Sequence, residues 1–436
     1  MASLIGIRRE DINPWERRTP LIPNHVRELR ERHGIETLVQ PSPIRVFTDE
    51  DYRLQDARVT EDLGPAPVVF ALKEIPPPLI EKDKVYAFFS HTAKGQPHNM
   101  PMLKRMMELG STIIDYEMVA DAQGRRLLSF GNYAGQAGMV DTLWALGRRL
   151  LEEGMKTAFA ELEPAHRYGS LVEAKEAVAR VGWKIEHRGL PDGLAPLIVG
   201  FLGYGRASSG AQEIFDLLPS EEVTPGDVGR LRDKVHSAHR LYKAVFKEEH
   251  MVKPRSAGRA FDLQDYYRNP GEYKPVVEDA LPHLTVLVNG IFWTPHFPRF
   301  VTKAFLARLF APGETPTLRV IGDISCDING AVEATLKPTD PEDPVFVYDP
   351  ERDEAISGFA GRGPVILAVY NLPAELPLEA STYFSGALKE FVPAIARADF
   401  QATFPEIELP ESIRRAIIVY RGELTPAYPN LSPLVL

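Results

Sequence analysis

The sequence is short of cysteine and of long apolar runs. Cys326 is the single cysteine among 436 residues, which excludes a disulfide framework and a cysteine-based metal site and predicts a reducing cytoplasm. No uncharged apolar run reaches the roughly 20 residues that a membrane helix needs. The N-terminal stretch "MASLIGIRRE" lacks the apolar region of a secretory signal. We therefore expect a soluble cytoplasmic protein with no membrane partner and no metal.

Positive charge is also in short supply. The chain has 60 acidic and 50 basic side chains, giving a net charge of −10. This balance argues against a nucleic-acid partner, because nucleic-acid binding usually needs a basic face. Hydrophobic residues at 44% and charged residues at 25% are ordinary values for a globular protein. A chain of this length can bury a substantial core in two or three domains.

Strand and helix patterns alternate along the chain. Residues 3–9 have a strand pattern, residues 24–34 a helix pattern with Asn24 as N-cap and Gly34 at its end, and residues 35–40 a second strand pattern. Such alternation predicts parallel sheets with helices on their faces. A long helix is expected over residues 133–154, and the proline-rich tail is expected to hold helices at 387–398 and around 411–420.

A glycine-rich turn lies in "LIVGFLGYGRASSGAQEIFDLLP", residues 197–219. An apolar strand precedes the turn and a helix follows it, so free backbone N–H groups and the helix dipole can hold a pyrophosphate there. Gly203 permits the tight turn and Gly205 lets the backbone approach phosphate. Ser208 can donate a hydroxyl hydrogen bond, and Gly210 allows close packing of the helix on the strand.

The turn departs from the usual dinucleotide motif. Ser208 stands where the third glycine is common, and a plain strand-to-helix turn without a ligand is the alternative. The acidic residue expected about 20 positions later is not clear, because Glu221, Glu222 and Asp227 follow no obvious strand end. The choice between NAD and NADP stays open on these residues.

An arginine-rich loop, "RREDINPWERRTPLIP", lies near the N-terminus. Its members Arg8, Arg9, Arg17 and Arg18 suit an acidic substrate, because guanidinium groups bind carboxylates through paired hydrogen bonds. A solvated charged loop is the alternative.

Two further candidates follow apolar strand patterns. Lys73 and Glu74 end "VVFALKE", where an open α/β sheet places its ligands. Burial there would lower the lysine pKa and provide a neutral amine as a base, although a lysine leaving the sheet for solvent fits the pattern equally well. His91 follows "YAFFS" and can pass protons near neutral pH, but a hydrogen-bonded loop histidine is the commoner outcome.

A set of segments carries a family resemblance over nearly the whole chain. In order, they are "IGIRREDINPWERRTPLIPNHV", "ALKEIP", "AFFSHTAKGQ", "IIDYE", "GRRLLSFGNYAGQAGM", "LVNGIFW", "GDIS" and "NLPAELPLEASTYF". They resemble the lysine-ketoglutarate reductase domain and the lysine-forming saccharopine dehydrogenases, and more distantly alanine dehydrogenase and the transhydrogenase dinucleotide subunit. We expect the glutamate-forming domain of fused relatives to be absent.

The resemblance implies an α/β fold of two Rossmann-like domains, with parallel sheets flanked by helices and an active-site cleft between the domains. Residues 1–140 would form the N-terminal substrate and catalytic domain, similar to that of alanine dehydrogenase and transhydrogenase. Residues 141–375 would bind NAD(P), and residues 376–436 would return to the N-terminal domain.

The implied reaction is the interconversion of L-lysine, 2-oxoglutarate and NAD(P)H with saccharopine and NAD(P)⁺. The resemblance assigns Lys73 and His91 as the acid–base pair. It assigns substrate binding and local charge to five further residues: Arg18, Glu74, Gln96, Glu117 and Phe130.

The resemblance also implies the cofactor contacts: Arg125, Gly203, Gly205, Arg206, Ser208, Gly210, Asn289, Gly290, Ile291, Asp323, Ile324 and Ser325. The cofactor would be NADP or NAD, with NADPH slightly favoured. Gly-Arg at positions 205–206 matches the separate lysine-forming dehydrogenases, whereas their acidic residue for the adenosine ribose has no clear counterpart, so the two clues disagree.

Two other functions fit the same sequence. One is an amino-acid dehydrogenase of the alanine dehydrogenase type, which would use ammonia and a 2-oxo acid. The other is a non-catalytic regulatory protein that binds a dinucleotide. A homo-oligomer is compatible with the sequence, and the direction of net flux is left open.

Overall fold

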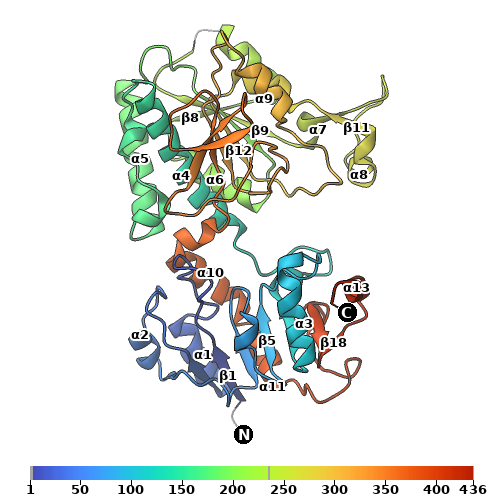
Figure 1. Ribbon diagram of the computed structural model, residues 1–436. Helices are drawn as coiled ribbons and strands as arrows, with labels where there is room; N and C mark the ends of the chain where they lie inside the picture. Colours follow the sequence, from blue (N-terminus) through green and yellow to red (C-terminus); the bar gives the residue numbers. More distant parts are fainter. Residues whose placement is uncertain (1–2, 234–235, 436) are drawn as a thin grey trace. The chain divides into compact units, whose positions relative to one another are not determined.

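The computed structural model describes residues 3–233 and 236–435 and forms two compact units (Figure 1). The first unit comprises Met1–Phe130 and Pro377–Leu436, and the second comprises Gly131–Leu376. Among the described residues no helix is long and apolar enough to cross a membrane. The domain boundaries expected from the sequence, with the roles assigned to them, stay a prediction.

The first unit is built on an eight-stranded sheet in the order β18-β17-β6-β5-β4-β1-β2-β3. Strands β1 to β6 pair in parallel, and β17 and β18 extend the sheet in antiparallel pairing after the chain returns. The strands are β1 (Ser3–Ile7), β2 (Ile35–Val39), β3 (Arg58–Val59), β4 (Val68–Phe70), β5 (Val85–Phe88), β6 (Thr112–Asp115), β17 (Ile417–Tyr420) and β18 (Glu423–Leu424).

The helices of the first unit come from both of its chain segments. In Figure 1 the orange-red C-terminal elements accordingly lie among the blue and cyan N-terminal ones. The helices are α1 (Pro23–His33), α2 (Asp49–Arg53), α3 (Met100–Glu108), α10 (Pro377–Leu388), α11 (Val392–Arg397), α12 (Glu411–Arg414) and α13 (Ser432–Val435).

Two local expectations in this unit are wrong. The N-cap of α1 is Ile22, without a side-chain cap bond, and Pro23 occupies the first turn in place of a cap at Asn24. Proline suits that position because its φ is already helical and it lacks an N–H that would need a partner. The helix expected around residues 411–420 ends at Arg414, and the β-branched run that follows forms strand β17, which pairs with β6. Gly34 ends α1 in the left-handed conformation with φ 64°, as predicted.

The second unit is built on a second eight-stranded sheet, in the order β15-β14-β16-β13-β12-β7-β9-β8. Its strands are parallel except for β14 and β15, and a separate antiparallel pair joins β10 to β11. The strands are β7 (Ile198–Leu202), β8 (Ser220–Val223), β9 (Leu241–Phe246), β10 (Val252–Pro254), β11 (Tyr273–Pro275), β12 (Val286–Asn289), β13 (Val320–Asp323), β14 (Val345–Asp349), β15 (Glu354–Ser357) and β16 (Val365–Leu367).

Helices cover both faces of this second sheet. Alternate residues of β7 point to opposite cores: Val199 packs with the helices α4, α5 and α6, and Ile198 packs with the side that includes α9. Figure 1 shows α4 and α5 on one side of β9 and β12, and α9 on the other. The helices are α4 (Gly131–Glu152), α5 (Leu171–Arg188), α6 (Arg206–Phe215), α7 (Glu248–Met251), α8 (Leu263–Arg268) and α9 (Lys303–Leu309). The predicted α/β class, with two mostly parallel sheets flanked by helices, is confirmed.

Candidate functional site

Chemically active side chains follow three neighbouring strands of the first sheet. Lys73 lies just after β4, His91 just after β5 and Glu117 just after β6. The three strands are adjacent and parallel, so their carboxyl ends meet at one edge of the sheet. Ligands of open α/β sheets bind at this edge. The fold therefore brings three of the predicted site residues to a single sheet edge.

His91 and Glu74 form a close pair at that edge. The His91 Nδ1 and Glu74 Oε1 atoms are 2.6 Å apart, and the two side chains are 31% and 19% exposed. Burial acts to raise the pKa of Glu74, but the hydrogen bond and charge of His91 outweigh it and lower the pKa to about 2. Glu74 therefore stays ionised and fixes the ring so that Nε2 is the nitrogen left for proton exchange.

Two contacts hold His91 in place. Its backbone has a left-handed φ of 48°, and the Asn99 side-chain amide donates to its carbonyl oxygen over 3.3 Å. The Phe89 ring stacks on the imidazole, with centroids 6.1 Å apart and planes at 18°. A non-glycine residue in this conformation is uncommon and clusters at functional sites.

Lys73 lies in a partly buried, charged environment. Burial lowers the pKa of its amine, and the positive charge of Arg18 acts in the same direction, against the nearby carboxylates. The Glu10 carboxylate accepts hydrogen bonds from the backbone N–H groups of Leu72 (2.7 Å) and Lys73 (3.0 Å), which fixes the loop that carries the lysine. Burial, followed by the charge of Glu16, raises the pKa of Glu10 to about 7. Burial and the Arg18 charge therefore make the Lys73 ammonium easier to deprotonate than that of an exposed lysine.

Arg18 is buried against an acidic and an aromatic partner. Its guanidinium group donates to both carboxylate oxygens of Glu16, over 2.8 and 2.6 Å, and lies 4.2 Å from the centre of the Phe130 ring. Phe130 stacks on Phe384 at 4.6 Å, and Phe89 packs against both rings. These aromatic contacts join the predicted residues Arg18 and Phe130 to the side of the His91 ring.

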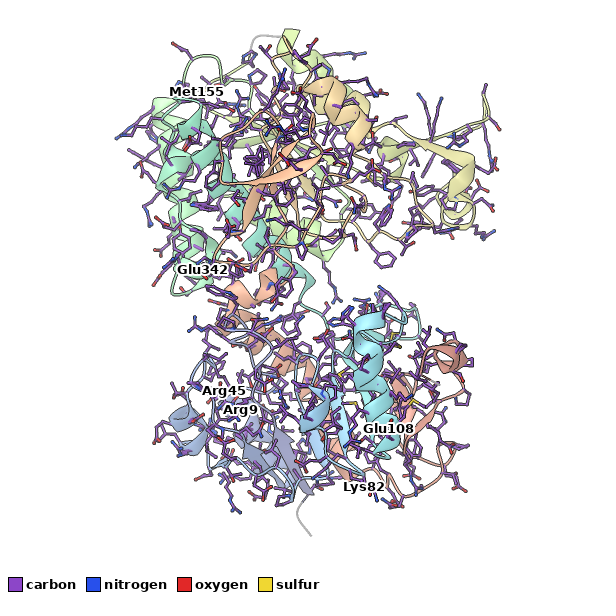
Figure 2. All side chains as sticks on the ribbon, in the orientation of Figure 1. Arg9, Arg45, Lys82, Glu108, Met155 and Glu342 are labelled. Atoms are coloured by element: carbon purple, nitrogen blue, oxygen red, sulfur yellow. The ribbon has the colours of Figure 1, made fainter. Side chains whose placement is uncertain are left out.

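The other arginines of the predicted loop have different partners. Arg8 pairs with Asp11 at 2.7 Å, and Arg9, labelled in Figure 2, pairs with Glu61 at 2.9 Å. Arg17 donates to a backbone carbonyl oxygen over 3.3 Å. The four arginines therefore do not converge on one point, and Arg18 is the member that the fold brings to the Lys73 environment.

Gln96 and Glu117 belong to the same edge. The Gln96 Oε1 atom is buried without a hydrogen-bond partner among the described residues. Glu117 contacts Arg126 at 2.5 Å and Lys94 at 3.6 Å. Burial acts to raise the pKa of Glu117, but the charges of Arg126 and Lys94 outweigh it and lower the pKa. Arg125, in contrast, is 76% exposed and pairs with Asp121 at 2.7 Å.

Several residues at this edge escaped the sequence analysis. Glu10 and Glu16 lie in the arginine-rich loop, but the sequence analysis considered only its arginines. Their alternation with arginines was the signal that could have predicted ion pairs within the loop. Asp115, at the end of β6, accepts a hydrogen bond from Ser90 Oγ over 2.5 Å, and burial raises its pKa to about 6. The shared signal is position, since each follows or ends a parallel strand.

The glycine turn of the second unit joins β7 to α6. Gly203 has a φ of +83°, a conformation that favours glycine, and a Cβ there would lie 2.7 Å from Ile291. Gly205 is the N-cap of α6, and no described atom lies within 4 Å of the position its Cβ would take. Arg206 begins the helix. Ser208 Oγ donates to the Gly203 carbonyl oxygen over 2.7 Å, which holds the turn closed.

Gly210 permits a close approach between two helices. A Cβ at Gly210 would lie 2.1 Å from the Asn132 carbonyl oxygen of α4, and a Cβ at Gly135 of α4 would lie 1.9 Å from the Ala207 carbonyl oxygen of α6. The sequence had suggested that Gly210 lets the helix pack on its strand. Its close neighbour is instead helix α4, which positions the start of α6.

The loops after β12 and β13 are tied to each other. Asn289 Nδ2 donates to Asp323 Oδ1 over 2.8 Å, and the Asn289 carbonyl oxygen accepts from the N–H groups of Ile324 (3.0 Å) and Ser325 (3.3 Å). Ser325 Oγ donates to the Ile291 carbonyl oxygen over 2.5 Å. Burial raises the pKa of Asp323 to about 6. These predicted residues form one buried network beside Gly290, whose Cβ would lie 2.9 Å from the Ser208 nitrogen.

A pocket of about 530 Å³ opens beside the glycine turn, within the second unit. It lies at the carboxyl ends of β7, β9 and β12. Its lining residues are Gly203, Tyr204, Gly205, Glu248, Met251, Tyr266, Tyr267, Gly290, Ile291, Phe292, Phe297 and Phe300. Four of the predicted cofactor residues thus share a pocket with aromatic residues and a carboxylate that the sequence analysis missed.

Comparisons with known proteins agree with this architecture. The family described as alanine dehydrogenase/PNT, N-terminal domain, matches residues 6–137. An alanine dehydrogenase of known structure superposes with a TM-score of 0.62 at 20% identity, covering 99% of this chain and 100% of the other. At that identity the superposition supports the fold alone.

Two proteins of similar sequence have names that describe an enzymatic reaction. Alpha-aminoadipic semialdehyde synthase from Arabidopsis thaliana is 38% identical over 98% of this chain, which spans 41% of that relative's length. Saccharopine dehydrogenase [NAD(+), L-lysine-forming] from Emericella nidulans is 25% identical over 87% of this chain and 89% of its own. The resemblance inferred from the sequence motifs is confirmed.

Proposed function

Because the chain is homologous to alpha-aminoadipic semialdehyde synthases and lysine-forming saccharopine dehydrogenases, we propose that it is an NAD(P)-dependent oxidoreductase of lysine metabolism. It interconverts L-lysine, 2-oxoglutarate, NAD(P)H and a proton with saccharopine, NAD(P)⁺ and water. The observation that carries this proposal is the partly buried Lys73 at one sheet edge with the hydrogen-bonded His91–Glu74 pair.

The reaction needs protons to move on and off two substrate atoms, the ε-nitrogen of lysine and the ketone oxygen of 2-oxoglutarate. The ε-ammonium of lysine loses a proton before its nitrogen attacks the ketone carbon of 2-oxoglutarate. The ketone oxygen then gains protons and leaves as water, and the resulting imine carbon takes the hydride. We assign the acceptance of the ammonium proton to Lys73 Nζ, whose pKa burial lowers, and the delivery of protons to the departing oxygen to His91 Nε2.

The remaining residues of the edge bind and orient the substrate. Arg18 suits a carboxylate because its guanidinium group presents several donors in one plane. Gln96 suits the zwitterionic end of lysine or saccharopine, because its side chain offers both a donor and the buried acceptor Oε1. Glu117 and Phe130 supply charge and an apolar wall in the same environment.

The second unit fits a nicotinamide dinucleotide. The N–H groups at the start of α6 suit a pyrophosphate, and the open side of Gly205 leaves room for its approach. Gly203 and Gly290 keep the two loops close at this point, and Arg206 adds positive charge. When bound, the dinucleotide supplies the hydride. Asn289 and Asp323 stabilise the neighbouring loops, as their buried hydrogen bond supports.

The test is absorbance at the reduced-nicotinamide band, with purified protein, lysine and 2-oxoglutarate. Oxidation of NADH or NADPH that requires both substrates supports the proposal. Oxidation with ammonia and pyruvate, and none with lysine and 2-oxoglutarate, would indicate an alanine dehydrogenase type of reaction instead. Nucleotide binding without turnover on any amine would indicate a regulatory protein.

We propose a cytoplasmic location on the ground that Cys326 is the single cysteine. Fluorescence microscopy of a tagged chain in its native cell is the measurement that decides it.

A further inference from the structure

The backbone of His91 is held in an uncommon conformation by its surroundings. Its φ of 48° lies in the left-handed region, which a non-glycine residue keeps only where neighbouring contacts impose it. Glu74 fixes the ring and Asn99 fixes the carbonyl oxygen, but neither bond reaches the residues on either side. Those residues are Ser90 and Thr92, and both are fully buried at 0% exposed. Buried hydroxyl groups need hydrogen-bond partners, and here the partners lie within the loop itself and on β6.

The two hydroxyl groups and one carboxylate form a chain of hydrogen bonds around His91. Ser90 Oγ donates to Asp115 Oδ2 over 2.5 Å, and Ser90 Oγ lies 2.7 Å from Thr92 Oγ1. A hydroxyl group carries a single hydrogen, so the Thr92 hydroxyl must donate to Ser90 Oγ. The Thr92 backbone N–H also donates to Ser90 Oγ, over 3.3 Å. The chain runs from Thr92 through Ser90 to Asp115, and it ties together the residues on both sides of His91.

The sheet fixes the position of Asp115 independently of the loop. Asp115 is the last residue of β6, which pairs in parallel with β5, and it is 0% exposed. Its N–H donates to the Ala416 carbonyl oxygen over 2.9 Å, and its Oδ1 accepts from the Glu117 N–H over 2.8 Å. The other carboxylate oxygen, Oδ2, accepts from Ser90. The carboxylate therefore connects the loop to a strand of the sheet.

Asp115 is ionised at the pH of an ordinary assay. Burial raises its pKa to about 6, although the hydrogen bonds from Ser90 and from the Glu117 N–H act against that rise. Of the titratable neighbours, the Glu117 carboxylate raises the pKa and His91 lowers it. Above about pH 7 the Asp115 carboxylate can only accept hydrogen bonds, which fixes the direction of the chain.

We propose that Asp115 is a positioning residue for His91 and acts through the Ser90 hydroxyl group. The chain holds the left-handed backbone at His91 and so sets the direction in which the imidazole exchanges protons with the substrate. Both Asp115 carboxylate oxygens are occupied within the protein, so its effect reaches the substrate through His91. The inference rests on the proposed function, because it assumes that His91 transfers protons in that reaction. The alternative is that the buried hydroxyl groups stabilise the fold alone.

Ser90→Ala removes the central hydroxyl group and leaves Asp115 bonded to the Glu117 N–H. We expect kcat to fall by about 10- to 100-fold, because a misplaced catalytic group loses up to about that much. The KM values for lysine and 2-oxoglutarate should change by less than about threefold, since the groups that bind substrate are retained. Steady-state assays use whichever of NADH and NADPH the wild type oxidises.

Ser111→Ala is the matched control. Ser111 lies in the same unit, is also 0% exposed, and donates its hydroxyl hydrogen to the Glu81 carbonyl oxygen over 3.2 Å. The variant loses a buried hydroxyl group that has no bond to the His91 loop. It should therefore change kcat by less than about twofold.

A double-mutant cycle separates positioning from simple stabilisation of the fold. In His91→Gln the imidazole is absent, so Ser90→Ala added to that variant should lower kcat further by less than about threefold. Single-turnover assays with excess protein measure these slow reactions. A loss of about tenfold or more both with and without the imidazole would show that Ser90 acts on the fold, and would overturn the proposal.

A crystal structure of Ser90→Ala tests the geometry without any turnover. The His91 φ should leave the left-handed region, or the distance from His91 Nδ1 to Glu74 Oε1 should exceed about 3.5 Å. An unmoved His91 would overturn the proposal. If a thermal melt shows that Ser90→Ala does not fold, Thr92→Val removes only the first hydroxyl group of the chain. Its kcat should fall by about three- to tenfold, and an unchanged kcat would overturn the proposal equally.

Assays of the wild type distinguish this inference from the proposed function. If the wild type oxidises NADH or NADPH with lysine and 2-oxoglutarate, and Ser90→Ala and Ser111→Ala have equal kcat values, the function stands and the role of Asp115 fails. If the wild type has no activity with these substrates, the proposed function fails and this inference fails with it.

Discussion

The two units have similar sheets but use the ends of their strands differently. In the first unit, side chains such as Lys73 and His91 follow the parallel strands and carry charge and protons. In the second unit, Gly203 and Gly290 follow β7 and β12, and what they present is backbone. In the proposed function, the same architecture would supply acid–base groups in one unit and a phosphate cradle in the other, depending on whether the residue after a strand has a functional side chain or none.

The largest expected effect comes from removing the acid–base group of the first unit. Lys73→Met should lower kcat by about two to four powers of ten, because general acid–base catalysis contributes about that much. The dissociation constant of this variant for NADH should change by less than about twofold, since the glycine turn and the pocket beside it belong to the second unit. Steady-state assays and calorimetry measure the two quantities.

Lys82→Met is the matched control for Lys73→Met. Lys82 lies in the first unit, is labelled in Figure 2 and is 75% exposed. It should leave both kcat and the dissociation constant unchanged. Equal losses in the two variants would contradict the role of Lys73 as a base.

The second prediction concerns the close contact between α4 and α6 in the second unit. In Gly210→Ala the new methyl would lie 2.1 Å from the Asn132 carbonyl oxygen, and overpacking of this kind costs about 1–3 kcal/mol. Hydrogen exchange measured by mass spectrometry should show the loss of protection within Gly131–Leu376. Gly271→Ala is the control, because no described atom lies within 4 Å of its Cβ position. Unchanged exchange in Gly210→Ala would mean that α4 and α6 adjust freely.

The third prediction concerns pH and the charge pair of the first unit. The pKa of Glu74 falls from its ordinary value of 4.5 to about 2 on folding, so the pair stabilises the fold fully above pH 4.5. That contribution is lost as the pH falls from 4.5 through 2. Glu74→Gln should therefore be less stable than the wild type at pH 6, by about 1–3 kcal/mol, and the gap should close in acid.

Urea unfolding at a series of pH values measures that gap. Glu108→Gln serves as the control, because Glu108, labelled in Figure 2, is 51% exposed and its pair with Arg105 lies on the surface. A surface pair contributes at most about 1 kcal/mol. A gap for Glu74→Gln that persists at pH 2 would show that the carboxylate charge is not its cause.

The smallest expected effect tests whether the first unit contributes to nucleotide binding at all. We keep Arg125 as a proposed cofactor contact, although its side chain is exposed and paired with Asp121. Arg125→Gln should weaken NADH binding by no more than about fivefold and change stability by less than about 0.5 kcal/mol. Calorimetry measures the NADH affinity of the variant, and thermal melts measure its stability. An unchanged affinity would mean that Arg125 makes no contact with the nucleotide and that residues of the second unit alone bind it.

The sequence predicted elements well where pattern and local chemistry agreed. Lys73 and His91 were found because each follows a continuous apolar run, which is the pattern of a buried parallel strand. The helix expected around residues 411–420 was wrong because tertiary pairing with β6 decides the state of β17. Short apolar runs are compatible with either structure, and the partner strand is far away in the sequence.

Glu248 shows a second limit of prediction from the sequence, a strand that was not recognised. Its strand β9 escaped notice because Lys243 interrupts the apolar pattern "LYKAVF". In the folded chain Lys243 is 8% exposed and its amine lies 2.7 Å from Asp216, a residue that precedes β8. A buried lysine paired with a half-exposed carboxylate thus replaces the apolar residue that the pattern demands, and a single-sequence pattern has no means to reveal that pairing.

The interrupted first unit has a consequence for synthesis. The ribosome completes β6 early, but its neighbour β17 emerges only after the whole second unit has been made. Roughly 300 residues separate them, so at about 5–20 residues per second the outer edge of β6 waits unpaired for on the order of tens of seconds. An open edge invites pairing with other nascent chains. During translation the second unit is therefore complete before β17 can cover the edge of β6, and we expect that edge to be where the nascent chain most needs protection.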